Sequence, residues 1–460
     1  MLTSKTLYTI LAGLAVTHAA VLPRSNVEYD LQSGAKSKIN GEAPVAVSLE
    51  FFAFPGYVQN VGSTAQCLKN LGDAAGSPTR VRVGGTTQFF DLAGALEGPA
   101  TIGLNRRLNT INNTIAAAKK AVQKMSNLFA FELGNEPDLY VQADPIANNQ
   151  TWTPALDAGI QVSWQKQVGD ALGQKDIIQG GVFLQPPKFS IQELGPVEQS
   201  SGSIDYVRSW ADHSYPQSAC GTSKTNLETL QNHTTIVNYV KTFQPEVDAA
   251  RSLGDRPLVF GETNSATCGG GGISPTFGAA LWLMDYTLQS VKLGYERLHF
   301  HQGTIDYSPY SWWGTKYVFA PYYGAYFAAS ALEGMSSISQ IDDGSTELGV
   351  YSFWNQDQLS RAVIYNSVFY PNTTTVARPY QEVVLSNIPK GCHQAIVKRL
   401  SAQYSTSQQE LGQVPTYAGQ SFANSTCIIE GDEQVEKVKI NNGKAVISVG
   451  ASEAVLVYFV

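Results

Sequence analysis

The chain has 460 residues, of which 43% are hydrophobic, so it is long enough to hold more than one domain around a large core. Its formal net charge is −7 at pH 7. This acidic balance argues against nucleic acid and against strongly anionic polymers as partners.

The first residues have the pattern of a secretory signal peptide. Lys5 precedes an apolar run over 7–16, and small residues at −3 and −1 favour cleavage after Ala19. Residues 1–19 are therefore expected to be removed, and the mature protein is expected to be secreted and extracellular. No later segment is apolar for long enough to cross a bilayer, so no membrane partner is expected.

Short β-type runs alternate with helical stretches from residue 45 to about 335. The predicted strands cover 45–51, 79–85, 100–104, 131–136, 176–182, 210–215, 257–262 and 297–301. The predicted helices cover 63–74, 111–125, 155–172, 234–253 and 276–293. Eight strands alternating with helices predict an α/β fold, a (β/α)8 TIM barrel that forms the catalytic domain.

From residue 336 to 460 the β-runs follow one another without intervening helices. They cover 351–354, 361–365, 381–385, 395–400 and 451–460. Asn442-Gly443 is a hairpin signal within this region. The sequence predicts a C-terminal antiparallel β-sandwich domain, and the N-terminal segment 20–44 is a candidate for an additional strand of it.

Two carboxylates end strands of the predicted barrel. Glu136 follows an apolar strand and precedes Pro137, which has no amide to extend a ladder, and Glu262 ends the seventh strand. Because a parallel barrel collects its chemistry at the carboxyl ends of its strands, we expect the two side chains to face each other. Such a pair fits a glycosidase with one proton donor and one nucleophile, and a separation of roughly 5–5.5 Å indicates retention. The alternative is that each glutamate only forms a salt bridge with an arginine.

Three sequence strings carry a resemblance to a known family. They are Arg-Val-Gly-Gly at 82–85, Glu-Leu-Gly-Asn-Glu-Pro at 132–137 and Gly-Glu-Thr-Asn at 261–264. The chain resembles glycoside hydrolase family 79 of clan A, from about residue 45 through the C-terminal β-domain. That family holds the β-glucuronidases and the heparanases.

The resemblance implies roles for individual residues. Glu136 is expected to be the acid/base and Glu262 the nucleophile, which must differ in environment so that one keeps its proton. Asn135 is expected to bind the sugar 2-hydroxyl, and Tyr215 to orient Glu262. Glu50, at the end of the first strand, resembles a residue that contacts sugar hydroxyls.

The uronate carboxylate is expected to be bound after the nucleophile strand, where the family donates backbone amides from a loop. Here Cys268, Gly269 and Gly270 stand in that place, in a glycine-rich run that can form an anion-binding concavity. The family's tyrosine in this loop has no counterpart, and Tyr307 after the eighth strand is our choice for a second tyrosine. The alternatives are that the loop is flexible and held only by Cys268, and that Glu50 pairs with an arginine, Arg82.

Other polar and aromatic side chains near strand ends have less specific interpretations. His213, His299 and His301 suggest a zinc site, but no third ligand has suitable spacing, so no metal or other cofactor is predicted. Trp312 and Trp313 either stack on the aglycone or cover the rim of the barrel.

Five cysteines leave at least one unpaired. We predict disulfides Cys220–Cys268 and Cys392–Cys427, with Cys67 as a buried free thiol in a helix. Five sequons are the expected glycosylation sites of the exported chain: Asn112, Asn149, Asn232, Asn372 and Asn424.

The function expected is that of a secreted exo-β-glucuronidase, which removes terminal glucuronic acid or its 4-O-methyl form with retention. The partner is a glucuronide-bearing glycan or glycoside, with side chains of plant or fungal polysaccharides as natural substrates. The alternatives are a heparanase-like endo-glucuronidase, which the acidic balance disfavours, a neutral-sugar β-glycosidase, and an inactive carbohydrate-binding relative.

Overall fold

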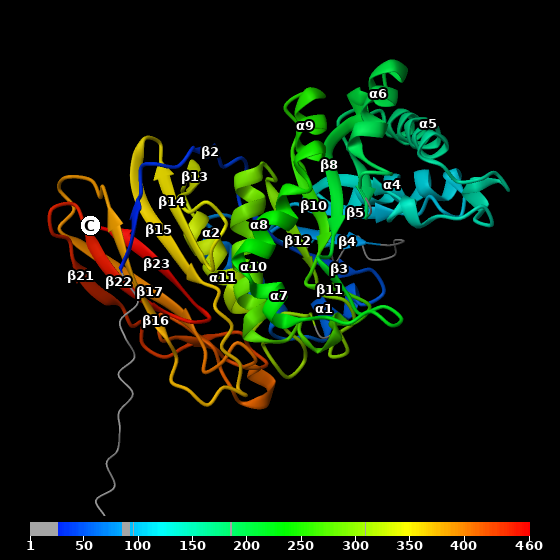
Figure 1. The fold of residues 1–460 in the computed structure, drawn as a ribbon. Helices are drawn as coiled ribbons and strands as arrows, with labels where there is room; N and C mark the ends of the chain where they lie inside the picture. The colour runs from blue at the N-terminus through cyan, green and yellow to red at the C-terminus, as the bar shows by residue number, and fades with distance from the viewer. Residues whose placement is uncertain (1–25, 85–92, 95, 185, 309) are drawn as a thin grey trace, which may run out of the picture.

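The computed structural model describes residues 26–84, 93–94, 96–184, 186–308 and 310–460. The predicted signal peptide and the first residues of the N-terminal segment lie outside this part of the chain. A barrel surrounded by helices occupies one side of the molecule and a β-domain the other (Figure 1). None of the described helices is both long and apolar enough to span a membrane.

The barrel is closed by eight parallel strands in the order β10-β12-β3-β4-β5-β6-β7-β8, so the predicted (β/α)8 barrel is confirmed. The strands are β3 (Val45–Glu50), β4 (Val81–Gly84), β5 (Ala100–Leu104), β6 (Leu128–Leu133), β7 (Ile178–Phe183), β8 (Val207–Ser214), β10 (Leu258–Thr263) and β12 (Arg297–His301). Most of their residues are buried on both faces, which explains why the sequence shows apolar runs rather than strict alternation.

Helices cover the outside of the barrel. They are α2 (Thr64–Ala75), α4 (Ile111–Lys124), α5 (Pro154–Leu172), α6 (Ile191–Ser201), α8 (His233–Lys241), α9 (Gln244–Ser252), α10 (Phe277–Leu293) and α11 (Pro321–Leu332). The helix predicted over 234–253 is two helices, because the chain breaks at Thr242 and Phe243, and Pro245 lies in the first turn of α9. The helix α10 is buried on nearly all sides, since it lies between the barrel and the β-domain (Figure 1).

The β-domain is a sandwich of an antiparallel sheet, in the order β18-β17-β23-β15-β14-β13-β2, and a smaller sheet, β1-β16-β22. The larger sheet holds β2 (Ser37–Lys38), β13 (Ser337–Gln340), β14 (Leu348–Asn355), β15 (Gln358–Asn366), β17 (Gln394–Ser401), β18 (Thr416–Tyr417) and β23 (Glu453–Phe459), with β21 (Glu436–Lys439) beside β17. The smaller sheet holds β1 (Val27–Asp30), β16 (Tyr380–Ser386) and β22 (Ala445–Gly450). The predicted sandwich is therefore confirmed, and β1 and β2 of the N-terminal segment pair with β16 and β13.

The hairpin predicted at Asn442-Gly443 is also confirmed. Asn442 and Gly443 both have positive φ, and Asn441 pairs with Lys444 across them. These are the conformations that a tight primed turn requires and that Asn-Gly adopts readily.

One predicted disulfide is confirmed and the other is wrong. Cys220 bonds Cys268, but Cys427 bonds Cys67 of α2, with a Cα–Cα distance of 5.4 Å, and Cys392 is the free cysteine. The segment around Cys427 packs on the barrel helices rather than on its own sheet. Asn70 of α2 donates to the carbonyl of Cys427 over 2.7 Å.

Two carboxyl groups are buried together between β8 and α9. Asp212 accepts a 2.6 Å hydrogen bond from the Tyr295 hydroxyl, and Glu246 accepts one of 2.7 Å from the amide of Ile191. The other oxygens, Asp212 Oδ1 and Glu246 Oε1, have no hydrogen-bond partner among the described residues, and the charge of Glu246 disfavours a second charge on Asp212, so a proton on one of them is favoured. Burial, followed by the charge of Glu246, raises the pKa of Asp212 well above its usual range, and burial raises the pKa of Glu246 to about 7.

This pair predicts that the fold loses stability as the pH rises through neutrality. A carboxyl pKa that is higher in the folded state favours folding while the group is protonated, so its contribution is complete below about pH 4.5 and lost towards pH 7. The loss is on the order of 2 kcal/mol. Differential scanning calorimetry of the wild type and Glu246→Gln from pH 4.5 to 8 should show a smaller decrease of Tm in the variant. Parallel curves for the two proteins would contradict this prediction.

Candidate active site

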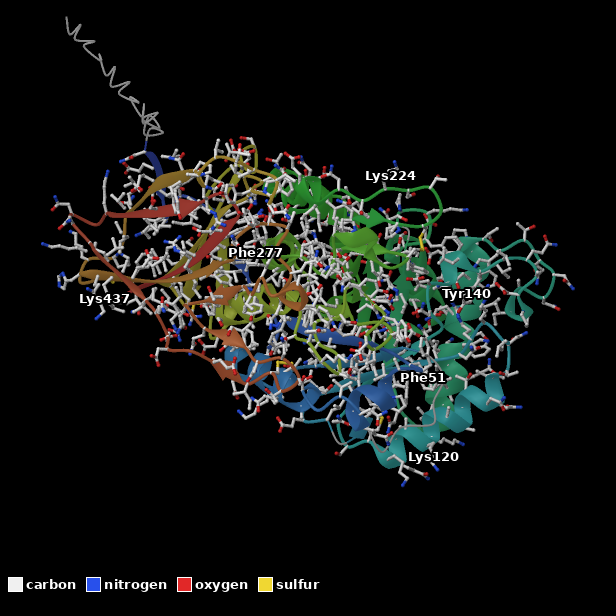
Figure 2. All side chains as sticks on the ribbon, turned by 90° about the horizontal axis from the view of Figure 1, so that it is seen from below. Phe51, Lys120, Tyr140, Lys224, Phe277 and Lys437 are labelled. Carbon is white, nitrogen blue, oxygen red and sulfur yellow. A yellow bond between two sulfur atoms is a disulfide. The ribbon has the colours of Figure 1, made fainter. Side chains whose placement is uncertain are left out.

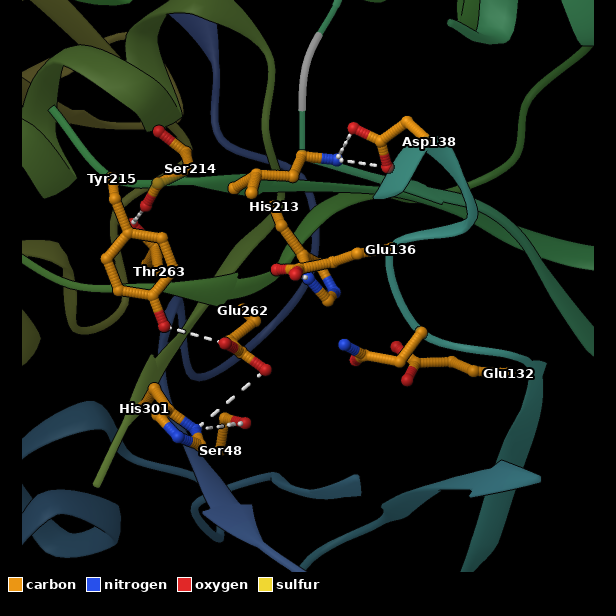
Figure 3. Close-up of polar contacts among 12 residues, drawn as sticks. Ser48, Glu132, Glu136, Asp138, His213, Ser214, Tyr215, Glu262, Thr263 and His301 are labelled. Atoms are coloured by element: carbon orange, nitrogen blue, oxygen red, sulfur yellow. Dashed lines mark hydrogen bonds and ion pairs between the residues drawn. The ribbon is translucent and has the colours of Figure 1, made fainter. Parts of the chain in front are cut away.

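The carboxylates of Glu136 and Glu262 meet at the carboxyl end of the barrel (Figure 3). Glu262 belongs to β10, and Glu136 follows β6 after Gly134 and Asn135. One oxygen of each carboxylate and one ring nitrogen of His213 lie within 4.8 Å of one another. Two side chains that are remote in sequence therefore face a common point, as the parallel topology requires.

Glu136 has an unusual backbone conformation. Its φ is +45°, a left-handed value that is uncommon for a residue with a Cβ atom, and Gly134 before it has φ +96°. The chain thus turns sharply between β6 and the short 3₁₀ turn Pro137–Leu139. Strained conformations of this kind are held by surrounding structure and concentrate at functional sites.

Glu262 is held as an ionised carboxylate. The Arg82 guanidinium donates to Oε2 from Nη1 over 2.6 Å, and the Tyr215 hydroxyl donates to Oε1 over 2.6 Å. Burial alone would raise the pKa of Glu262, but the charges of His301, Arg82 and His213 and the Tyr215 hydrogen bond lower it well below its usual range. The contact predicted between Tyr215 and Glu262 is therefore present.

Arg82 forms hydrogen bonds with several polar side chains at the base of the site. Its side chain is 1% exposed, and besides Glu262 it donates to Glu132 over 2.8 Å and to Oδ1 of Asn135 over 2.7 Å. Since Oδ1 of Asn135 already accepts from Arg82, the amide nitrogen of Asn135 is left as the group that can reach a ligand. The ion pairs of Arg82 are with Glu132 and Glu262, and Glu50 contacts His301 instead.

Glu136 has a different partner from Glu262. Its Oε1 lies 3.0 Å from Nδ1 of His213, whose side chain is buried. Only one of the two glutamates therefore pairs with an arginine. The sequence does not predict the contact with Glu136, although Tyr215, directly after β8, is two residues from His213 and alternation places the two side chains on one side.

His301 lies on the opposite side of Glu262. Its Nδ1 is 3.3 Å from Ser48 Oγ and 3.9 Å from Glu262 Oε2, and its Nε2 is 3.3 Å from Glu50 Oε2. Burial lowers the pKa of His301, but the charges of Glu262 and Glu50 outweigh it and the pKa is raised. A charged His301 adds to the positive field around Glu262 and orients the carboxylate of Glu50.

The three histidines do not come together as a zinc site. His299 has a different environment from His301, because its Nδ1 lies 3.1 Å from the Phe260 carbonyl and burial lowers its pKa. Among the described residues, Glu136, His213 and Glu262 are the group with ligand atoms close enough to share a cation. Both oxygens of Glu262 already accept strong hydrogen bonds, which fits a carboxylate held for chemistry rather than a metal ligand.

The glycine-rich loop is anchored on both sides. Cys268, Gly269 and Gly270 all have positive φ, as do the next two glycines. The disulfide of Cys268 with Cys220 and a 2.9 Å hydrogen bond from Thr225 to the Gly271 carbonyl attach the loop to the segment after β8. The loop is therefore held by more than the disulfide alone.

The aromatic residues after β12 divide into exposed and buried ones. Tyr307 is 85% exposed. Tyr310, which the sequence does not single out, packs on the His301 ring with a centroid distance of 5.7 Å. Trp312 and Trp313 are fully buried, and Trp313 donates to Thr64 of α2. They cover the rim of the barrel, and the alternative that they stack on an aglycone is wrong.

The loops at the mouth of the barrel lie apart from the β-domain. Phe51, Tyr140 and Lys224, from loops that follow β3, β6 and β8, lie on the side remote from Lys437 of β21 (Figure 2). A parallel barrel with two facing carboxylates at this end defines the chain as a glycoside hydrolase.

Comparison with known proteins agrees with this class. The family model described as the glycosyl hydrolase family 79 C-terminal β domain matches residues 350–456. The crystal structure of a 4-O-α-L-rhamnosyl-β-D-glucuronidase from Fusarium oxysporum 12S, as a Rha-GlcA complex, is 41% identical, with a TM-score of 0.89, over 94% of this chain and 100% of that one. The β-glucuronidases of Neurospora crassa and Aspergillus niger are each 28% identical, over 76% and 72% of both chains respectively. The chain belongs to glycoside hydrolase family 79.

Proposed function

We propose that the chain is a secreted, retaining exo-β-glucuronidase that removes terminal β-linked glucuronic acid, or forms of it substituted on O4, from glycans. Glu136 is the acid/base and Glu262 the nucleophile. One observation carries this proposal. An oxygen of Glu136 and an oxygen of Glu262 lie within 4.8 Å of each other, and the Glu262 carboxylate is held by Arg82 and Tyr215. Three relatives that are named as glucuronidases support the substrate class.

The two steps follow from the difference between the carboxylates. In the first, Glu262 attacks the anomeric carbon while Glu136 protonates the glycosidic oxygen, so the bond to the leaving group breaks and a covalent glycosyl-enzyme forms. In the second, Glu136 takes a proton from water, and the water oxygen attacks the same carbon and displaces Glu262. Arg82 and Tyr215 stabilise the carboxylate that departs, because their hydrogen bonds favour the ionised form.

Other residues of the site bind the sugar. The free amide nitrogen of Asn135 is directed to the 2-hydroxyl, and Glu50, oriented by His301, accepts from other hydroxyls of the ring. Backbone amides of Cys268, Gly269 and Gly270 bind the uronate carboxylate, for which a run of positive φ values suits an anion-binding loop. Tyr307 stays a candidate for a contact from the mouth of the barrel.

Secretion is part of the proposal. Two disulfides are typical of a chain that folds in an oxidising compartment. Asn112, Asn149 and Asn372 are exposed, as glycosylated asparagines must be. Asn232 and Asn424 also accept hydrogen bonds through Oδ1, which leaves their amide nitrogens available for a glycan.

A panel of nitrophenyl glycosides tests the substrate class. We expect kcat/KM for the β-glucuronide to exceed that for the β-glucoside and the β-xyloside by about 10²-fold or more, because amides placed for a carboxylate are left unpaired by a neutral sugar. The three glycosides have the same leaving group, so they serve as controls for one another. Equal or faster hydrolysis of the β-glucoside would show a neutral-sugar glycosidase instead.

A further inference from the structure

A pocket adjoins the candidate catalytic residues. It has a volume of about 190 Å³ and lies between the loop after β5 and the loop after β6. Its polar lining consists of Arg82, Asn105, Arg106, Arg107, Asn135 and Tyr140. Because Arg82 and Asn135 belong to the catalytic cluster as well, the pocket is continuous with the site that holds the sugar.

Arg106 brings unpaired donors to this pocket. Its side chain is fully buried and Nη2 donates to Asp157 over 2.6 Å, but neither Nε nor Nη1 has a hydrogen-bond partner among the described residues. A buried guanidinium N–H without an acceptor costs free energy, so such groups normally have a partner. The arginine is therefore placed to receive a group from outside the chain.

The remaining side chains of the pocket also offer donors. The oxygens of Asn105 and Asn135 already accept, from the Leu108 amide and from Arg82, which leaves both amide nitrogens. Arg107 pairs with Asp144 through Nε, which leaves its terminal nitrogens. No carboxylate lines the pocket among the described residues. The charged side chains of the lining are all arginines, so the lining favours a carboxylate over a neutral group.

The position of the pocket identifies which carboxylate it takes. Gly134, Asn135 and Tyr140 line it from both sides of Glu136 in the chain. The group that departs from the sugar is the one whose oxygen Glu136 protonates, so a pocket formed by the chain neighbours of Glu136 is within reach of the leaving group. The two loops are joined by a hydrogen bond of 3.1 Å from the Ile146 amide to the Arg107 carbonyl, which keeps the pocket in shape.

We propose that this pocket is a subsite for a carboxylate on the leaving group, and that the enzyme prefers glucuronides whose aglycone is itself acidic. The inference rests on the proposed function of Glu136 as the acid/base. It names an acidic aglycone as the substrate class, in addition to the uronate carboxylate that the glycine-rich loop binds.

Kinetics with matched aglycones test the subsite. The probes are the 3- and 4-carboxyphenyl β-glucuronides and the corresponding carbamoylphenyl β-glucuronides, which have a similar size but a neutral amide in place of the carboxylate. For at least one isomer, we expect kcat/KM of the carboxylate to exceed that of the amide by about tenfold. The difference should lie in KM, because the pocket binds the carboxylate before and during reaction alike.

Two variants connect the preference to the pocket. Arg107→Gln removes exposed donors. Arg106→Lys keeps a positive charge beside Asp157 but loses the planar set of N–H groups. Both variants should bring the ratio of kcat/KM, carboxylate over amide, towards one. Arg251→Gln, on the surface of α9, removes a guanidinium elsewhere and should keep the wild-type ratio. The subsite is contradicted if the wild type hydrolyses both amides as well as or better than the carboxylates, or if both pocket variants keep the wild-type ratio. Either result leaves the proposed function standing. No hydrolysis of any of these glucuronides contradicts the proposed function and the subsite with it.

Discussion

Glu262→Gln should reduce the turnover of an aryl β-glucuronide by on the order of 10⁴-fold or more. The amide is nearly isosteric with the carboxylate and can still contact Arg82 and Tyr215, but it cannot attack the anomeric carbon. The loss should appear in kcat as well as in kcat/KM, since the nucleophile acts in the transition state and contributes little to substrate binding. Steady-state kinetics of 4-nitrophenyl β-glucuronide hydrolysis measure both.

The control for this variant is Glu228→Gln, an exposed glutamate of α7 (Leu227–Gln231) that is not among the residues assigned to the site. It should keep wild-type activity. Circular dichroism and Tm of Glu262→Gln separate lost chemistry from lost folding, because the variant removes one partner of the buried Arg82. Near-wild-type turnover in a folded Glu262→Gln would exclude Glu262 as the nucleophile.

Glu136→Ala should have an effect that depends on the leaving group. For a poor leaving group such as an unactivated phenol, the loss of general acid catalysis should cost about 10²- to 10⁴-fold in kcat/KM. For 2,4-dinitrophenyl β-glucuronide, which needs no protonation, the first step should be almost unaffected and the glycosyl-enzyme should accumulate. Burst kinetics and kcat/KM for the two substrates measure this difference.

Azide provides the positive test of the same variant. A small anion can enter the space that the Glu136 carboxylate leaves and attack the glycosyl-enzyme without a general base, so azide should raise kcat and yield the β-glucuronosyl azide. The wild type should show neither effect. If Glu136→Ala lost the same factor on both leaving groups and azide gave no adduct, the acid/base would be another residue.

The parts of the site that the sequence predicts are those set by topology. Glu262 lies near the end of β10, Glu136 follows β6 and Tyr215 follows β8, so the barrel brings all three to its carboxyl end. Local patterns therefore suffice for the fold and for the facing pair of carboxylates. The same topology explains the disulfide Cys220–Cys268, which joins the loops after two adjacent strands.

Contacts that depend on side-chain packing are beyond such reasoning. Arg82 reaches Glu132, Asn135 and Glu262 at once, and nothing in the spacing of these residues fixes that set. The disulfide Cys67–Cys427 connects segments 360 residues apart, because the β-domain packs on α2. Its prediction needs the relative placement of the two domains, which no local pattern contains.

The burial of aromatic residues shows the same limit. Trp312 and Trp313 follow the eighth strand, as substrate-binding residues often do, yet both are covered by packing against Tyr322 of α11. Tyr310, two residues earlier, packs on His301 in the site instead. A loop without regular periodicity gives no signal that separates an inward from an outward side chain.

The covalent intermediate offers the most direct test of the proposed mechanism. Incubation with 2-deoxy-2-fluoro-β-glucuronosyl fluoride slows the second step more than the first, so the glycosyl-enzyme can be digested and its modified residue located by mass spectrometry. We expect one adduct per chain, on the peptide that contains Glu262 and on that side chain. A label on a different residue, or active enzyme that turns the reagent over through an inverted product with no adduct, would contradict it.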